Sequence, residues 1–391
     1  MLRVVTLSSL FPDASRPNFG VFVERQTAAL AAVPDTEVRV VAGVGLPPRP
    51  LTRHQRYQTL AALPARETWH GLEVDRPRFL ALPGTAGRFH AAALARAAAR
   101  VLDPLAGTFD VIDASFFFPD GVAAVGLGRR YGVPVSIKAR GADIHHWARA
   151  RVTRAQVRRA GLAADGLLAV SAAMREDMAV LGLPRERIRV HHTGVDHRRF
   201  APADRDSLKR ALGVAGPLVV SVGALIPRKG HDVTIEAVAA LPDVTLAIAG
   251  EGPERAALER LVRRLGMGDR VRLLGGVAHD DLSRWLAAAD AMALASSSEG
   301  LANAWVEALA CGTPIVVADA GGAREVVTAP SAGRIAAREP AAFASALRAL
   351  MADPPAPAVV RTHAAGFTWE ANGAALRDHL AGLVARAGQR G

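Results

Sequence analysis

Short runs rich in aliphatic and β-branched residues alternate with longer alanine-rich segments along most of the 391-residue chain. The apolar runs include "LRVVTLSS" at 2–9, "FDVIDAS" at 109–115 and "PLVVSVGAL" at 217–225. The segments between them, such as "FVERQTAALAA" at 22–32, have the composition and length of helices. Strands that alternate with helices are joined by crossovers, which makes the strands parallel and covers the sheet with helices. The sequence therefore predicts an α/β fold with doubly wound parallel sheets.

The alternating pattern is interrupted by a polar, helix-poor passage near residues 196–206 and then restarts. A chain of this length is also longer than one hydrophobic core usually serves. We therefore predict two tandem Rossmann-like lobes facing a central cleft, an N-terminal lobe at 1–198 and a C-terminal lobe at 199–370. Ligands of such sheets bind beyond the carboxyl ends of the strands. A last helix at 371–391 has no strand after it, and we expect it to cross back to the N-terminal lobe.

The composition favours a reducing compartment and predicts no membrane-spanning helix. The single cysteine, Cys311, cannot form an internal disulfide, and no apolar run reaches the roughly 18 residues that span a bilayer. The first residues, "MLRVVTLSSLFP", are interpreted as a strand because they lack the apolar helical region and cleavage site of a signal peptide. We therefore expect a cytoplasmic protein.

The formal net charge of +11 favours an anionic partner. Nucleic acid is disfavoured, because only 5% of the residues are aromatic and no recognisable nucleic-acid-binding module is present. A predicted helix at 145–161 gathers Arg149, Arg151, Arg154, Arg158 and Arg159. This basic helix has two interpretations that stay open here: a solvated face, or a patch that docks to an anionic membrane surface and places the protein peripherally at the inner face of the cytoplasmic membrane.

Two glutamates, Glu299 and Glu307, lie eight positions apart around a predicted helix start. The stretch 290–298 is predicted to be a buried strand and 303–312 a helix. The first turn of that helix is predicted to contain Leu301, Ala302 and Asn303. Unpaired amides there, with the helix dipole behind them, would bind a diphosphate, and the two carboxylates would accept hydrogen bonds from sugar and ribose hydroxyls. The alternative is one acid that complements the helix dipole and one ordinary surface acid.

Several other stretches accompany the glutamates. "VSVGALIPRKGHD" at 220–232, "IAGEGPER" at 248–255 and "LLGGV" at 273–277 lie in the predicted second lobe, and "FFFPDGVAA" lies in the first. Together with "SSSEGLANAWVEALACGTPIVVADAGGAREVV" at 296–327, they resemble the motifs of retaining glycosyltransferases with two Rossmann-like lobes, the GT-B fold, and specifically of family 4. The resemblance covers nearly the whole chain. It implies that the N-terminal lobe is the acceptor side and that the C-terminal lobe binds the nucleotide sugar.

The resemblance implies roles for individual residues. Glu307 would hold the donor ribose, and Glu299 would contact the transferred sugar. Lys229 would neutralise the leaving phosphate, and Arg228 beside it is a candidate to compensate for Ala224, which replaces an arginine common in the family. The other residues implied in donor binding are Gly20, Gly223, Gly250, Glu251, Val277, Leu301, Ala302 and Asn303.

On the acceptor side the resemblance implies Arg140, Asp143 and Ser115. The family often has a histidine where "KARGADIHH" at 138–146 has Arg140. Arg140 with Asp143 would suit a negatively charged sugar or acceptor, or a pyrophosphate. A structural salt bridge between the two residues is an equal alternative.

The implied reaction is front-face displacement, in which the leaving phosphate accepts the proton of the acceptor hydroxyl while Lys229 and the helix start stabilise its charge. No metal and no cofactor are expected. The implied partners are a nucleotide-sugar donor and a sugar, polysaccharide-precursor or lipid-linked acceptor, in the synthesis of cell-envelope glycans, polysaccharides or glycolipids. Two alternatives stay open: a nucleotide-sugar epimerase of the same fold, and a non-catalytic subunit that binds nucleotide sugars.

Overall fold

The computed structural model describes residues 1–389, except for the side chain of Arg56. The chain forms two compact units: the first contains residues 1–193 and the segment from Trp369 onward, and the second is Gly194–Thr368. The first boundary thus falls at 193/194, whereas the sequence predicts it at 198/199. The chain leaves the first unit and returns to it through paired segments, because Val195 and Thr368 form a parallel bridge.

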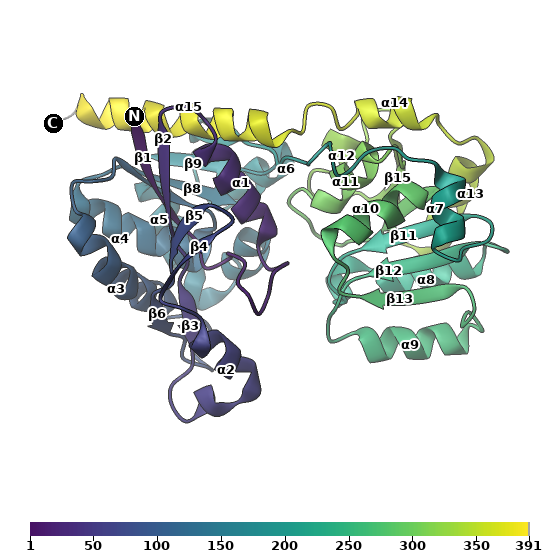
Figure 1. Ribbon diagram of the computed structural model, residues 1–391, viewed down its shortest axis with the longest axis horizontal. Helices are drawn as coiled ribbons and strands as arrows, with labels where there is room; N and C mark the ends of the chain where they lie inside the picture. The colour runs from purple at the N-terminus through teal and green to yellow at the C-terminus, as the bar shows by residue number, and fades with distance from the viewer. Residues whose placement is uncertain (390–391) are drawn as a thin grey trace. The chain divides into compact units, whose positions relative to one another are not determined.

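The first unit is built on an eight-stranded sheet in the order β10-β9-β8-β7-β1-β2-β5-β4. Figure 1 labels several of its strands, among them β1, β2, β8 and β9. Its strands are β1 (Leu2–Leu7), β2 (Thr36–Val41), β4 (Arg66–Trp69), β5 (Leu72–Asp75), β7 (Val111–Ala114), β8 (Val135–Ala139), β9 (Gly166–Ala169) and β10 (Ile188–Val190). All neighbours are parallel except β4 and β5, which form an antiparallel hairpin. The first lobe therefore departs from the predicted all-parallel sheet at this edge, and β3 (Val44–Leu46) and β6 (Arg78–Leu80) form a separate two-stranded sheet.

Two helices far apart in sequence, α1 (Val21–Ala31) and α15 (Trp369–Gly388), pack against each other and against the sheet of the first unit. They share one apolar cluster with the strands, formed by Leu2, Val4, Leu30, Val111, Leu168, Leu376, Leu380 and Leu383. Further helices are α2 (Gln55–Ala62), α3 (His90–Leu102), α4 (Val122–Tyr131), α5 (Arg151–Ala163) and α6 (Ala172–Val180). The helix that the sequence placed at 371–391 thus belongs by its contacts to the first unit.

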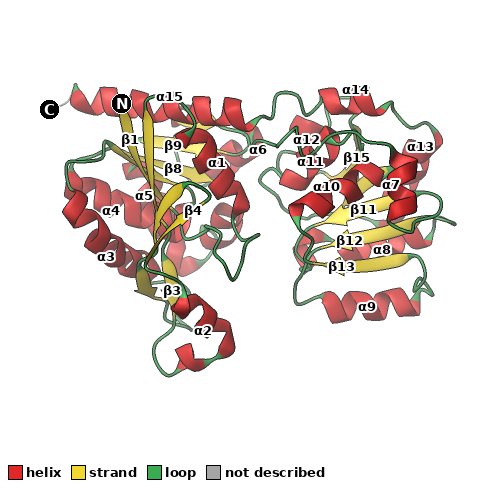
Figure 2. Cartoon of the chain, in the orientation of Figure 1, coloured by secondary structure: helices red, strands yellow, loops and turns green. Residues whose placement is uncertain are grey.

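The second unit is a six-stranded parallel sheet in the order β13-β12-β11-β14-β15-β16. Its strands are β11 (Leu218–Val222), β12 (Thr245–Ala249), β13 (Val271–Gly275), β14 (Ala291–Leu294), β15 (Ile315–Ala318) and β16 (Gly333–Ala336). Numbered within the unit, the order is 3-2-1-4-5-6, as in Rossmann folds. Figure 2 shows this sheet with helices around it, which are α7 (Arg205–Ala211), α8 (His231–Ala239), α9 (Arg255–Arg264), α10 (His279–Ala288), α11 (Asn303–Ala310), α12 (Ala323–Val326), α13 (Pro340–Ala352) and α14 (Pro357–Thr362).

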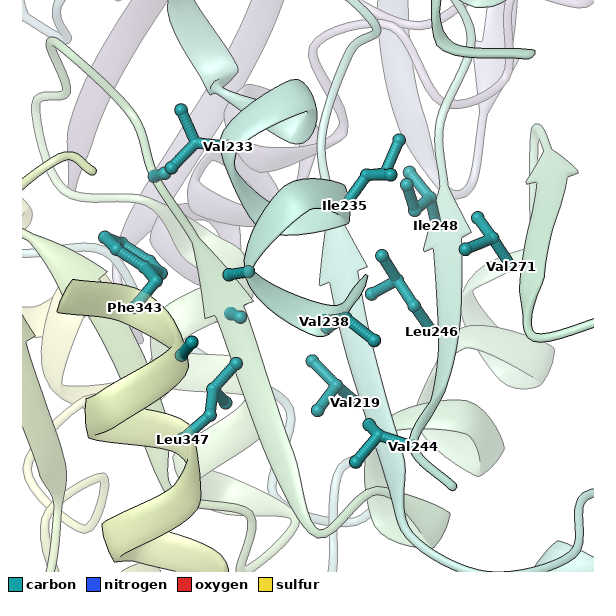
Figure 3. Close-up of a cluster of buried hydrophobic side chains, with 14 of the residues drawn as sticks. Val219, Val233, Ile235, Val238, Val244, Leu246, Ile248, Val271, Phe343 and Leu347 are labelled. Atoms are coloured by element: carbon teal, nitrogen blue, oxygen red, sulfur yellow. The ribbon is translucent and has the colours of Figure 1, made fainter. Parts of the chain in front are cut away.

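The core of the second unit explains why its strands were recognisable in the sequence. Side chains of β11, β12 and β13 meet those of α8 and α13 in one cluster, in which Val219, Leu246 and Phe343 are fully buried (Figure 3). Helices cover both faces of a parallel sheet, so its strands are nearly continuous apolar runs. Burying one such side chain stabilises the fold by about 1.5–3 kcal/mol relative to leaving it exposed.

Two predicted elements were wrong in extent. The strand predicted at 290–298 ends at Leu294, and a loop then leads to the helix that begins at Asn303. The single basic helix predicted at 145–161 is divided into a turn at Asp143–Trp147 and α5, because Ala150 has extended backbone angles. Within residues 1–389, no helix has both the length and the apolar character needed to cross a bilayer.

Candidate active site

The strand order of the second unit reverses between β11 and β14, which lie side by side. Lys229 is in the loop after β11, and Glu299 is in the loop after β14. Because the carboxyl ends of parallel strands meet at one edge of the sheet, both loops lie at the topological switch point, where such folds bind ligands. The chain topology therefore brings together two residues that are 70 positions apart.

Lys229 and Glu299 form a direct ion pair. Lys229 Nζ donates a hydrogen bond to Glu299 Oε1 at 2.5 Å, and Ser296 Oγ donates to the same oxygen at 2.7 Å. Arg228 Nη1 lies 3.5 Å from Glu299 Oε2 and donates to the carbonyl of Ser298. Both cations of this loop therefore face one carboxylate, although neighbouring loop residues often point apart. The ammonium group of Lys229 has three N–H donors, so two remain for other acceptors.

Glu299 is a stable carboxylate despite being only 7% exposed. Burial by itself would raise its pKa, but the charge and hydrogen bond of Lys229, the charge of Arg228 and the hydrogen bond from Ser296 outweigh burial and hold the pKa below its usual value. A carboxylate is purely a hydrogen-bond acceptor. Glu299 is thus suited to accept hydrogen bonds from ligand hydroxyls and to hold Lys229 in place.

Close backbone contacts hold the Lys229 loop. Gly230 has φ +66°, and a Cβ there would lie 2.1 Å from the carbonyl oxygen of Ala295, so the loops after β11 and β14 meet without room for a side chain. A Cβ on Gly250 would lie 1.9 Å from the carbonyl oxygen of Gly223, and Gly223 packs along the aliphatic stem of Lys229. The predicted donor-binding glycines 223 and 250 therefore support the lysine through the backbone.

His231 lies beside this loop, and the sequence predicts no role for it. Its Nε2 is 3.2 Å from the carbonyl oxygen of Gly223, and its Nδ1 is 3.1 Å from Ser221 Oγ. A carbonyl only accepts hydrogen bonds, so Nε2 carries the proton and Nδ1 accepts from the hydroxyl. Burial lowers the pKa of His231 to about 4, which keeps it neutral. A single sequence does not distinguish this histidine from a solvated one.

Helix α11 begins at the edge that carries Glu299. Its first residue is Asn303, so Leu301 and Ala302 precede the helix, although the prediction placed all three in its first turn. The backbone amides of these three residues donate no hydrogen bond within the described residues. Together with the positive end of the helix dipole, they can bind an anion beside Glu299.

Glu307 lies inside α11, one helical turn after Asn303, and is only 6% exposed. Its Oε1 lies 3.8 Å from His279 Nε2 at the start of α10. The alternative of an ordinary surface acid is therefore wrong for Glu307. A buried carboxylate needs polar partners. A ligand hydroxyl that donates a hydrogen bond to it is one such partner.

The other predicted donor residues of this unit follow β12 and β13. The carbonyl of Glu251 accepts a hydrogen bond from the amide of Leu225 at 2.9 Å, which ties the loop after β12 to the Lys229 loop. Val277 lines a pocket of about 250 Å³ with Gly276 and Trp285. Both residues are thus at the carboxyl edge of the sheet.

The first unit has its own switch point, between β1 and β7. The amide of Ser9, after β1, donates to Asp120 Oδ2, after β7, at 2.9 Å. Gly20 lies at the end of the same β1 loop with φ +71°, and a Cβ there would lie 2.5 Å from the carbonyl oxygen of Leu10. The close packing of this loop therefore requires a glycine at position 20. The phosphate contact of Gly20 that the resemblance implies stays a prediction.

The predicted acceptor-side residues lie together at this edge. Arg140 follows β8, and its Nε donates to the carbonyl of Ser115, after β7, at 2.7 Å. The backbone amide of Arg140 donates to Asp143 Oδ1 at 3.1 Å. The Asp143 carboxylate is fully buried and also accepts hydrogen bonds from the amides of Phe117, Gly141 and Ile144. Asp143 is therefore bonded to backbone amides, and the predicted alternative of an Arg140–Asp143 salt bridge is wrong.

Comparison with known proteins identifies the family. The sequence profile of the family described as Glycosyl transferases group 1 matches residues 204–366, and that of Glycosyltransferase Family 4 matches residues 20–199. A GDP-mannose-dependent alpha-(1-6)-phosphatidylinositol monomannoside mannosyltransferase of Mycolicibacterium smegmatis is 32% identical over 299 residues, which are 71% of this chain and 78% of the relative. The chain therefore belongs to family 4 of the glycosyltransferases, the group 1 glycosyl transferases.

A D-inositol 3-phosphate glycosyltransferase of Mycolicibacterium gilvum is 37% identical over 214 residues, so the match spans 50% of this chain and about half, 48%, of that relative. Sucrose-phosphate synthase of Thermosynechococcus elongatus has a TM-score of 0.82 at 20% identity and covers 99% of this chain and 100% of its own. HepE of Anabaena, solved with UDP, has a TM-score of 0.75 at 22% identity, with coverages of 98% and 100%. The predicted GT-B fold is confirmed.

Proposed function

We propose that this protein transfers a sugar, with retention of configuration, from a nucleotide-sugar donor held by the second unit to an acceptor hydroxyl. The observation that carries the proposal is the Lys229–Glu299 ion pair at the switch point, beside the unbonded amides at the start of α11. Cations and amides there suit a diphosphate, and the carboxylates of Glu299 and Glu307 suit hydroxyls. The mycobacterial relative named above uses GDP-mannose, and HepE has been solved with UDP-glucose, which supports a nucleotide-sugar donor.

In the proposed step, the bond between the anomeric carbon and the leaving phosphate breaks while a bond to the acceptor oxygen forms on the same face of the sugar. The acceptor proton moves to the leaving phosphate oxygen, so no side chain is needed as a base. Lys229 and the α11 amides stabilise the charge that develops on the phosphate, which is electrostatic catalysis by preorganised groups. We propose cell-envelope glycolipid or polysaccharide synthesis as the setting, because a relative acts on a phosphatidylinositol mannoside.

The proposal is tested by supplying a panel of nucleotide sugars with and without acceptor sugars and glycolipids. Nucleoside diphosphate release coupled to acceptor glycosylation is expected, with the anomeric configuration of the donor retained in the product as read by NMR. Epimerisation of the donor without an acceptor, or donor binding without turnover under all conditions, would count against transfer.

Transfer is expected to need no divalent cation, because Lys229 and the amides at the helix start supply the positive charge that a metal would otherwise bring to the diphosphate. Activity after treatment with EDTA should equal untreated activity within about twofold. A loss that added Mg²⁺ restores would contradict the metal-independent step. The matched control is the same assay on a glycosyltransferase with a known Mg²⁺ requirement, which EDTA must inhibit.

We further propose that α5 docks to an anionic membrane surface. The helix exposes Arg151, Arg154, Arg158 and Arg159, its segment has no acidic residue, and Val152 and Leu162 are 41% and 39% exposed beside the arginines. Each basic residue near such a surface contributes about 1 kcal/mol. Binding to vesicles that contain phosphatidylglycerol should therefore weaken with salt and fall at least about tenfold when Arg151 and Arg154 are changed to glutamine.

The control for that experiment is the pair Arg263→Gln and Arg264→Gln on α9, which removes the same charge from the last turn of a helix in the other unit. These changes should leave vesicle binding unaltered. Equal binding to neutral and anionic vesicles would contradict the proposed docking, and the basic face of α5 would then be a solvated surface.

A further inference from the structure

The side chain of Arg140 is held in one position by three neighbours in the first unit. Its Nε donates to the carbonyl of Ser115 at 2.7 Å, and its Nη2 donates to Gln26 Oε1 at 3.0 Å. The ring of Phe22 lies beneath the guanidinium, with Cζ 4.9 Å from the ring centroid. Gln26 and Phe22 are both on α1, which starts at the switch point. The guanidinium is therefore preorganised at the carboxyl edge of the sheet, and Arg140 as a whole residue is partly exposed.

This positive charge has no carboxylate bonded to it within the described residues. The Asp143 carboxylate accepts hydrogen bonds from backbone amides, and the buried Asp113 forms no ion pair with Arg140, so both carboxylates act on the guanidinium only through their charge. A guanidinium carries five N–H donors. Two of those of Arg140 are used by neutral oxygens, and Nη1 donates to no described residue.

A second buried amine, that of Lys138, shares a hydrogen-bond acceptor with Arg140. Lys138 is 0% exposed, and its Nζ donates to Gln26 Oε1 at 2.8 Å, the same oxygen that Arg140 contacts. Its other neighbour is His191 Nδ1, also at 2.8 Å. Burial and the charge of Arg140 lower the pKa of Lys138 well below its usual value, and burial lowers the pKa of Arg140 to about 10, which leaves Arg140 charged at neutral pH.

We propose that Arg140 binds an oxyanion of the substrate, a phosphate or a carboxylate that is separate from the donor diphosphate. A planar guanidinium with free N–H groups recognises such groups bidentately, and a neutral histidine at this position would not. The oxyanion has two sources: a phosphate on the acceptor, or a carboxylate on a transferred uronic acid. This inference rests on the proposed function, which it makes more specific.

The first test compares matched substrates in wild type, Arg140→Gln and Arg140→Lys. One pair of acceptors differs only by a phosphate, and one pair of donors differs only by a C6 carboxylate, as glucuronate differs from glucose. Arg140→Gln should lower kcat/KM for the anionic member of one pair by about 30-fold or more, since a charge-assisted hydrogen bond contributes that much, and the neutral member should change less than about threefold. The pair that responds identifies the source, and Arg140→Lys should retain part of the preference.

An equal loss with charged and neutral substrates would overturn the inference, as would weakened binding of the nucleoside diphosphate itself, which would place Arg140 on the diphosphate. Arg129→Gln, which changes an exposed arginine in the last turn of α4, is the control and should change neither preference. Arg140→His, which restores the residue common in the family, replaces Arg140→Gln if that variant fails to fold.

A second readout separates failure of the inference from failure of the proposed transfer. Inorganic phosphate is titrated against thermal unfolding, with Lys229 already changed to alanine so that the second unit contributes less to anion binding. Phosphate should stabilise this background, and adding Arg140→Gln should remove most of that stabilisation. Identical phosphate stabilisation with and without Arg140 would overturn the inference, whatever the transfer assays show.

Discussion

Changing Lys229 to alanine is expected to lower turnover by about 100-fold or more. The ammonium group lies at the switch point with two N–H donors left after its bond to Glu299. Charge develops on the leaving phosphate as the glycosidic bond breaks, so a cation that contacts this phosphate stabilises the transition state more than the ground state. Removing one preorganised donor to a developing oxyanion costs about 10²–10³ in turnover. Steady-state kinetics with the identified donor and acceptor give the measurement.

The chain offers a close control for that substitution. Lys209 is also a partly buried lysine in an ion pair, with Nζ 2.6 Å from Asp290 Oδ2, and its side chain is 13% exposed against 14% for Lys229. Asp290 immediately precedes β14, so this pair lies at the opposite edge of the same sheet. Lys209→Ala should leave turnover within about threefold of wild type. Normal turnover in Lys229→Ala would refute the proposed role in neutralising the leaving phosphate.

Changing Glu307 to glutamine is expected to weaken donor binding by about 10- to 100-fold, with a smaller effect on turnover of the bound donor. The carboxylate is 6% exposed and is proposed to accept hydrogen bonds from the ribose hydroxyls. A hydrogen bond to a charged group contributes about 1.5–3 kcal/mol, and each 1.4 kcal/mol is tenfold in affinity. Calorimetric titration with the nucleoside diphosphate measures the loss directly, without an acceptor.

Glu259→Gln on the exposed face of α9 is the matched control, because Glu259 forms an exposed pair with Arg255 and should not affect the donor. The thermal unfolding midpoint of Glu307→Gln should be recorded as well, since the carboxylate lies near His279. Unchanged affinity for the nucleoside diphosphate in a folded Glu307→Gln protein would remove Glu307 from the donor site.

The main elements of the fold could be predicted from the sequence because buried strands have a recognisable composition. Strands such as β11 and β12 are covered on both faces, so they are continuous apolar runs that are visible without a structure. The hairpin strand β4 escaped prediction because only alternate residues of "RETW" are partly buried, which leaves no apolar run. The strand and the helix predicted around residues 295–302 both extend too far into this loop. Its residues are mostly buried, but the carbonyl of Ala295 accepts a hydrogen bond from Arg338 Nε and not from a neighbouring strand.

The residues of the candidate site could be predicted from the sequence, but the contacts between them could not. Motif positions pointed to Lys229, Glu299 and Arg140, whereas spacing along the chain carries no information about which side chains meet. The bond between Lys229 and Glu299 spans 70 positions, and the bond between Arg140 and Gln26 spans 114. Gln26 therefore received no role from the sequence, and Arg140 was paired with Asp143, its neighbour in the chain, instead.

The second unit is proposed to hold a nucleotide-sugar donor through Lys229, Glu299 and Glu307. The most direct test is a panel of UDP-, GDP-, ADP- and TDP-sugars, without metal, followed by thermal unfolding and by release of nucleoside diphosphate. Sugars of one nucleotide should stabilise the protein and be hydrolysed slowly, with release of the nucleoside diphosphate. Glu307→Gln should sharply reduce that stabilisation, whereas Glu259→Gln should leave it unchanged. Stabilisation by none of the nucleotide sugars, or equal stabilisation in Glu307→Gln, would contradict this donor site.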